Sequence, residues 1–352
     1  MTPEQKLFDE LLANALDILR LAASERDKVL RRLAKLEQEL IEQLNNQELS
    51  KLKRRELNRV LANANVTIAR YYDDIGLSID VPAIGLYASN ATSYAFEIAL
   101  SIDAVKLPRQ YYFASLAKDL LIQGSPQADW WRGQSADAAF KFAAQVRQGL
   151  VASETNQQII ARIVGKSGQP GVMDTVKRNA ASLVQTAVQS VANDARRETY
   201  KANDDIVKGL KQVSTLDSHT SLTCVAYSGA EWDLEYNPIG KKKLPFNGGC
   251  PRHFNCRSLE VPITKTFKEL GLNVPEPKGT TRASSDGQIS VDTTFDGFLQ
   301  RKGKAYQDEV LGVGRAELWR AGKITLRDLV NGNGRPVSLQ ELNELVRKRK
   351  AR

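Results

Sequence analysis

Cysteine and histidine are scarce in this sequence, whose 352 residues include only three cysteines and two histidines. The odd number of cysteines argues against a disulfide framework. The N-terminal residues MTPEQKLFDELL lack the basic start and apolar run of a signal peptide, which predicts a chain that stays in the cytoplasm where it is made. No segment approaches the run of about 20 apolar residues that spans a bilayer, so we expect no association with a membrane.

A phosphate-binding loop is also missing. Residues 165–171 (GKSGQPG) contain Gly, Lys and Ser, but not in the order GxxxxGK[ST], which excludes this form of nucleotide binding. The stretch is instead predicted to be a loop at a domain boundary.

The charge balance is mildly basic, at +9, which favours a polyanionic partner such as nucleic acid, although many soluble proteins carry a similar excess. Basic residues cluster near one predicted helix start: Lys51, Lys53, Arg54, Arg55 and Arg59. Such a run is usually a solvated face. It is also the best candidate for contact with DNA or with a partner protein in the N-terminal half.

Apolar residues at helical spacing predict a chain dominated by α-helix. Residues 3–46 carry a heptad-like stripe, which favours a helix packed in a bundle over a coiled coil with another chain. Further helices are expected at about 48–74, 83–103, 108–123, 135–151 and 154–164, the last starting at Ser153 and Glu154. The clearest apolar stripe lies in residues 172–202, with Lys177, Arg178, Arg196 and Arg197 on the opposite face.

The pattern changes after residue 202. Short strands are predicted at 206–216, 232–234 and 259–263, and short helices at 297–311 and 315–321. The fold class is therefore α+β, predominantly α, with long N-terminal helices followed by a small mixed α/β core with short strands. The predicted domains are a helical domain (1–165), a core with the Cys/His cluster (166–275), a linker (276–294) and a small helical C-terminal module (295–352).

All the cysteines and histidines fall between His219 and Cys256. The spacing Cys250-x-x-His253-x-x-Cys256 suits soft ligands that converge on one tetrahedral metal ion, and Cys224 would complete a Cys3His set for structural Zn²⁺. His219 is an alternative ligand. The competing interpretation is that these are small buried cysteines and a hydrogen-bonded histidine that bind no metal.

Three other roles fit residues of the same segment. A nucleophilic Cys224 with His253 or His219 needs a third group to orient the base, for which Asp217 is available. A metal-dependent nuclease with a metal-bound and a general-base histidine would require both histidines. Asp217 and Thr220 can instead shape the exit of the strand by bonding nearby backbone N–H groups, and Arg257 can pair with Asp217 or face DNA.

This segment resembles a known family. A helix ending in Ala195–Tyr200 leads into a strand, and then come Leu216-Asp217, Thr220-Ser221, Cys224, Gly229, Trp232 and His253-x-x-Cys256-Arg257. The pattern is similar to the D-x-x-T-S…C…H-P-x-C-R hallmark of the Mu F and SPP1 gp7-like family of minor head (head morphogenesis) proteins of tailed phages. The match covers residues 172–263. Phe254 stands where the family commonly has proline, and Ser258 where it commonly has cysteine.

The C-terminal block is also similar to that family. It contains Phe298-Leu299, Gln307, Leu311-Gly312, Leu318-Trp319 and the run 322–329 (GKITLRDL). The resemblance implies a non-enzymatic, low-copy virion protein inside the capsid near the portal, made in the host cytoplasm. It would contact the portal protein and the major capsid or scaffold protein, assist capsid assembly, and touch phage DNA during packaging or ejection. The alternative is a metal-dependent nuclease or a toxin-like effector that acts on nucleic acid.

Overall fold

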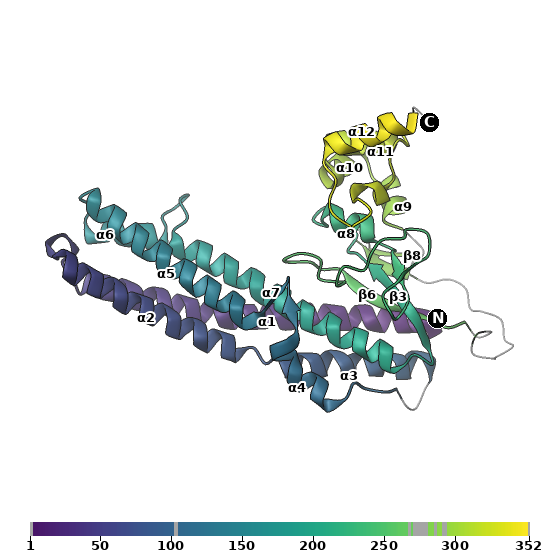
Figure 1. The fold of residues 1–352 in the computed structure, drawn as a ribbon, viewed down its shortest axis with the longest axis horizontal. Helices are drawn as coiled ribbons and strands as arrows, with labels where there is room; N and C mark the ends of the chain where they lie inside the picture. Colours follow the sequence, from purple (N-terminus) through teal and green to yellow (C-terminus); the bar gives the residue numbers. More distant parts are fainter. Residues whose placement is uncertain are drawn as a thin grey trace. The chain divides into compact units, whose positions relative to one another are not determined.

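The computed structural model describes residues 3–101, 105–266, 269, 281–284, 287–290 and 294–350. Helices fill most of the chain as far as Ala202, and a small sheet and further short helices follow (Figure 1), which confirms the predicted α+β, predominantly α class. The chain forms two compact units. Unit 1 comprises Met1–Ile18, Gly85–Gln110 and Ala192–Arg352, and unit 2 comprises Leu19–Ile84 and Tyr111–Val191. Unit 1 thus joins segments that the sequence had suggested were separate domains.

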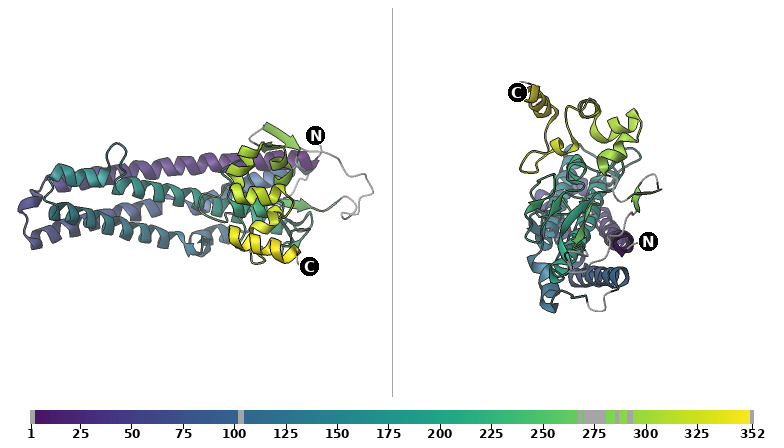
Figure 2. Two further views of the ribbon diagram at one scale, coloured as in Figure 1. Left: turned by 90° about the horizontal axis from the view of Figure 1, so that it is seen from above. Right: turned by 90° about the vertical axis from the view of Figure 1, so that its right-hand side faces the viewer.

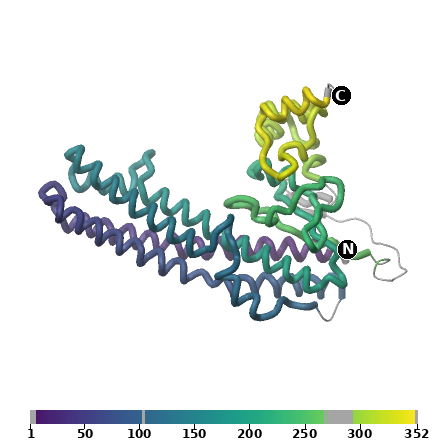
Figure 3. Tube along the Cα trace, in the orientation of Figure 1, coloured from purple at the N-terminus to yellow at the C-terminus, as the bar shows by residue number. Residues whose placement is uncertain are grey.

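Unit 2 is built from helices that run alongside one another. They are most of α1 (Pro3–Asn45), a 3₁₀ turn η1 (Leu49–Lys51), α2 (Arg54–Ser78), α4 (Gln110–Asp119), α5 (Gln127–Val151), α6 (Asn156–Val164) and the first two thirds of α7 (Val172–Ala202). Helix α2 packs against α5, and α5 packs against α6, so that the segments 19–84 and 111–191 lie side by side (Figures 2 and 3).

The apolar stripe of α1 is covered by this chain itself. Ala22, Val29, Leu33, Leu36 and Leu40 are at most 1% exposed. The same is true of Leu183, Val184, Ala187 and Val188 on α7. This burial agrees with the bundle interpretation of residues 3–46, because no second chain is needed to cover the stripe.

Two predicted helix boundaries are wrong in the middle of unit 2. Helix α4 ends at Asp119, because residues Leu121–Ile122 (β1) pair with Ser125–Pro126 (β2) around Gly124, whose φ is 91°. Helix α5 begins directly after this hairpin, at Gln127, so Trp131 is a buried helical residue and does not precede the helix.

The predicted start of α6 at Ser153 and Glu154 is also wrong. Thr155 is the N-cap: its side-chain oxygen accepts the N–H of Gln158 at 3.3 Å, and Gln158 Oε1 accepts the N–H of Thr155 at 2.8 Å. This reciprocal capping box satisfies two backbone donors that would otherwise lack partners at the helix start. Glu154 instead forms a bidentate ion pair with Arg162.

Unit 1 contains a four-stranded antiparallel sheet in the order β5-β4-β3-β6. Its strands are β3 (Val207–Val213), β4 (Glu231–Trp232), β5 (Pro238–Ile239) and β6 (Leu259–Thr264). The predicted strand 206–216 ends early, and a short helix that was not predicted, α8 (Leu222–Tyr227), follows it. Gly209 allows the close pairing of β3 with β4, since a Cβ there would lie 2.4 Å from the carbonyl oxygen of Trp232.

The C-terminal helices share the hydrophobic core of the sheet. They are α9 (Phe295–Gln300), α10 (Lys304–Leu311), α11 (Val313–Arg320), the 3₁₀ helix η2 (Leu326–Leu329) and α12 (Leu339–Lys350). Phe298, Trp319 and Leu342 belong to the same buried cluster as Leu210 and Trp232. Helix α8 packs against η2, which ties the Cys/His region directly to this block.

The predicted linker 276–294 contains a hairpin of β7 (Thr281–Ser284) and β8 (Gly287–Ser290), and most of its other residues lie outside the described ones. Helix α12 extends to Lys350, into the basic run that begins at Arg347. Arg349 makes two bonds to Asp328, at 2.8 and 3.0 Å. Within the described ranges, no helix combines the length and apolar character needed to cross a membrane.

Candidate metal centre

The three side chains that could hold a metal come from two elements. Cys224 lies on α8, whose N-cap Ser221 accepts the backbone N–H of Cys224 at 3.3 Å. His253 and Cys256 lie in the loop before β6, where the N–H of Cys256 donates to the carbonyl oxygen of His253 at 3.1 Å. This tight turn, with Asn255 at a φ of 60°, directs the two side chains to the same side of the loop.

The ligand atoms of Cys224, His253 and Cys256 all lie within 4.8 Å of one another. Cys224 Sγ is 3.5 Å from Cys256 Sγ and 3.4 Å from His253 Nε2. Tetrahedral zinc with Zn–S bonds of about 2.3 Å and Zn–N bonds of about 2.0 Å places neighbouring ligand atoms roughly 3.5–3.8 Å apart. The three residues are therefore close enough to bind one metal ion.

The ring of His253 is oriented for coordination through Nε2. His253 Nδ1 lies 2.8 Å from the carbonyl oxygen of Phe254, which can only accept, so Nδ1 carries the proton. Nε2 then carries the lone pair, which accepts the hydroxyl of Ser221 at 2.8 Å and lies 3.4 Å from Cys224 Sγ, so a metal ion would take the place of the Ser221 hydroxyl. A backbone carbonyl that fixes the tautomer in this way is typical of histidines that bind metals.

The sulfur atoms are electrostatically coupled. Hydrogen bonds from Cys224 and Cys250 lower the pKa of Cys256, whereas the bond to Cys256 and burial raise the pKa of Cys224. The bond to Cys256 also raises the pKa of His253. Cys256 is thus the thiol that ionises first, and a cation placed among the three groups would favour the thiolate form of Cys224 as well.

Cys250 lies next to this group but is not a member of it. The residue is 1% exposed, and this burial raises the pKa of its thiol. His219, the alternative ligand, is not among the residues that converge.

Asp217, Thr220 and Arg257 form a structural network beside the cluster. Arg257 makes two bonds to Asp217, at 2.6 and 2.8 Å, so it pairs with this carboxylate. The N–H of His219 and the hydroxyl of Thr220 also point to Asp217, at 3.0 and 3.1 Å. Despite burial, these bonds keep the pKa of Asp217 below its ordinary value. Asp217 therefore shapes the turn after β3 and does not orient His253.

The five clustered basic residues that the sequence suggested for contact with DNA or a partner protein belong to unit 2. Lys51, Lys53, Arg54, Arg55 and Arg59 are all exposed around the start of α2. Lys51 forms an exposed ion pair with Glu48 at 2.8 Å.

Three residues next to the cluster were not identified from the sequence as parts of the site: Ser221, Arg197 and Glu260. Ser221 is the N-cap of α8, and it could have been found only together with that helix, which was not predicted. Arg197 was expected on the polar face of α7, yet Arg196 and Arg197 are 1% and 7% exposed. Their burial depends on β6 and the Cys250 loop, which are remote in the sequence.

The comparisons with known proteins found no match. No family model, no curated protein and no solved structure is similar to this chain.

Proposed function

We propose that this chain is a minor head (head morphogenesis) protein of a tailed phage, a low-copy structural component of the virion near the portal and not an enzyme. One observation carries the proposal. The residues that bear the resemblance meet in space, since Asp217 pairs with Arg257, and Cys224, His253 and Cys256 form one cluster. Residues that matched a motif by chance would have no reason to converge.

The helices of unit 2 supply surface for protein partners. Val66, Leu77, Phe140 and Val151 are each at least 70% exposed. Exposed apolar side chains of this size can contact the portal protein and the major capsid or scaffold protein. The basic residues at the start of α2 would bind phage DNA through its phosphates, without sequence preference, during packaging or ejection.

The second part of the proposal is a structural Zn²⁺ ion held by Cys224, His253 and Cys256, the three residues that converge. Cys250, which lies outside the converging group, would become the fourth ligand by turning its side chain toward the ion. The chemistry of the donor set fits zinc, which prefers thiolate and imidazole ligands in tetrahedral sites. The ion would link α8 to the loop before β6. Such a link compensates for the small apolar area that this loop, rich in Gly and Lys, can bury.

A metal-dependent nuclease or a toxin-like effector is less well supported. A catalytic metal needs an open position for water or substrate. Here Cys224 and Cys256 are 2% and 1% exposed, and Ser221 covers His253 Nε2. A nucleophilic Cys224 is also disfavoured, because the residue is buried and Asp217, the group available to orient a histidine base, is paired with Arg257 instead.

The virion role is tested by protein composition. Particles assembled from the genome that encodes this chain should be purified with and without packaged DNA and quantified by mass spectrometry against the major capsid protein. We expect the chain in both kinds of particle at a small fraction of the capsid protein, and in complexes pulled down with the portal protein. Absence from both kinds of particle would contradict the proposal.

A further inference from the structure

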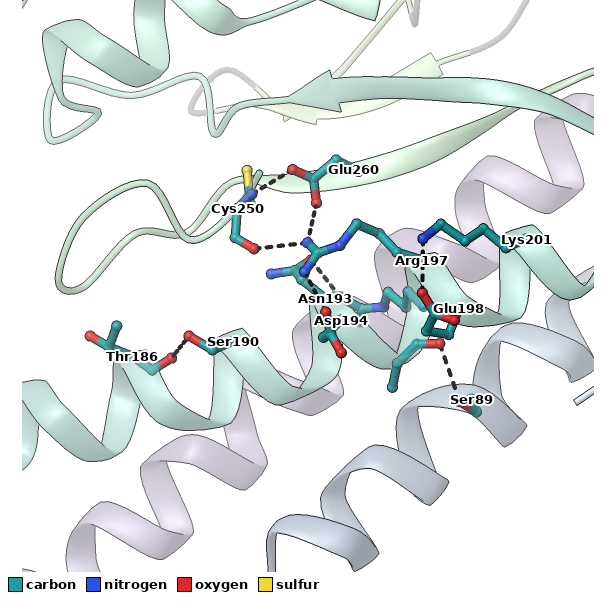
Figure 4. Close-up of polar contacts among 12 residues, drawn as sticks. Ser89, Thr186, Ser190, Asn193, Asp194, Arg197, Glu198, Lys201, Cys250 and Glu260 are labelled. Carbon is teal, nitrogen blue, oxygen red and sulfur yellow. Dashed lines mark hydrogen bonds and ion pairs between the residues drawn. The ribbon is translucent and has the colours of Figure 1, made fainter. Parts of the chain in front are cut away.

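Two buried charged side chains hold the backbone of Cys250 from both sides (Figure 4). Glu260 Oε1 accepts the N–H of Cys250 at 2.5 Å. Arg197 Nη1 donates to the carbonyl oxygen of Cys250 and to Glu260 Oε2, each at 3.2 Å. Arg197 comes from α7 and Glu260 from β6, so a single ion pair fixes both peptide groups that flank Cys250.

This ion pair needs an explanation beyond stability. The side chains of Arg197 and Glu260 are 8% and 1% exposed. The cost of removing both charges from water offsets much of their attraction, so a buried pair is often no more stabilising than apolar residues of the same size. What the pair supplies is a fixed geometry, and the backbone that it fixes belongs to Cys250.

Gly249 independently indicates that this contact is built into the loop. Gly249 has a φ of 73°, and a Cβ at this position would lie 2.8 Å from Glu260 Oε1 and 2.5 Å from the ring of Phe246. Only glycine allows Glu260 to reach the N–H of Cys250. Asp194, the other partner of Arg197 at 2.9 Å, holds the guanidinium from the opposite side.

We propose that Arg197 and Glu260 are positioning residues that present the Cys250 thiol to the metal as its fourth ligand. With both flanking peptide groups held, the thiol keeps only the rotation about χ1, and this rotation would have to bring it to the metal, since it is not yet among the converging ligand atoms. This inference rests on the zinc site proposed above. It adds that the ligand set depends on a contact with α7, outside the segment that carries the ligands.

The test uses the full chain with Co²⁺ as the probe, because thiolate-to-cobalt absorption reports how many sulfur ligands bind. We expect Glu260→Gln and Arg197→Lys each to weaken metal binding by about 10–100-fold and to reduce this absorption. Cys250→Ser should reduce it to the same extent. Adding Glu260→Gln to Cys250→Ser should then cause no further loss, because both changes act through one ligand.

Glu154→Gln is the matched control, since it breaks a bidentate Arg–Glu ion pair with Arg162 that involves neither Arg197 nor Cys250, and it should leave the cobalt spectrum unchanged. Circular dichroism identifies any variant that fails to fold. If Glu260→Gln or Arg197→Lys fails to fold, the other of the two tests the inference. The inference would be overturned, and the zinc proposal left intact, by either of two results. One is a further loss of thiolate absorption when Glu260→Gln is added to Cys250→Ser. The other is the full wild-type thiolate absorption in folded Glu260→Gln and Arg197→Lys. Wild-type protein that binds neither Co²⁺ nor Zn²⁺ would overturn both.

Discussion

The helices of unit 2 and the Cys/His region of unit 1 are stabilised in different ways. In unit 2, apolar stripes at helical spacing cover one another, and residues such as Leu33, Phe142 and Val184 are at most 1% exposed. Around Cys224 and Cys256, the six-residue helix α8 is buried in the core through Val225 and Tyr227, but its link to the loop before β6 consists of a few polar contacts. A helix with many apolar residues at regular spacing can therefore keep its place when one of them is replaced, whereas the metal centre depends on each of its few residues.

The largest expected effect is that of Cys256→Ser, which removes the most acidic thiol of the cluster. We expect wild-type protein to carry about one zinc per chain and the variant to carry none. Hydrogen exchange should increase in α8 and in residues 250–260, while α5 stays protected.

His219→Ala is the matched control for that prediction, because His219 lies outside the converging group. It should keep its zinc. Wild-type protein that contains no metal and whose melting temperature is unchanged by Cys256→Ser would contradict the metal site.

The second effect tests the helical side of the comparison. Phe142→Ala on α5 should lower the free energy of unfolding of unit 2 by about 3–5 kcal/mol, because it leaves a cavity in the packed core. Its zinc content should not change. Phe140→Ala, at a position that is 73% exposed on the same helix, should change stability by less than about 0.5 kcal/mol. Equal losses in both variants, measured by urea denaturation, would rule out this account of the core.

A smaller effect is expected for Asp217→Asn, which breaks the bidentate pair with Arg257. At neutral pH it should cost about 1–2 kcal/mol, between the values for exposed and buried pairs, since the side chains are 21% and 34% exposed. The pKa of Asp217 is lowered in the folded state, so this contribution is fully present above the ordinary aspartate value of 3.8 and disappears as the pH falls through the folded value.

Denaturation curves of wild type and Asp217→Asn should therefore converge in acid. Glu39→Gln removes an exposed ion pair with Arg70 in unit 2 and should cost at most about 1 kcal/mol. A gap between wild type and Asp217→Asn that persists in acid would show that the carboxylate charge is not what stabilises the turn.

The smallest effect concerns the start of α6. Thr155→Ala removes the N-cap oxygen and should lower stability by about 1 kcal/mol. Ser153→Ala, at the start expected from the sequence, should have almost no effect. A larger loss of stability for Ser153→Ala than for Thr155→Ala, measured by thermal denaturation, would favour a helix start at Ser153.

Periodic elements could be predicted from the sequence, and contacts between remote residues could not. The stripes of α1 and α7 gave both helices within one residue of their observed ends. Helix α8 was missed because six residues are too few to show a helical period. Convergence of Cys224, His253 and Cys256 was predictable because these residue types are scarce and clustered. Burial of Arg197 was not, because its partner Glu260 is 63 positions away.

The anchored end of α12 has a consequence for handling the protein. Arg347, Lys348 and Arg349 are attractive to trypsin, which requires an extended backbone in its active site. The helical backbone and the two bonds from Arg349 to Asp328 prevent an extended conformation until α12 unwinds. Limited trypsinolysis should therefore spare these peptide bonds in the native chain.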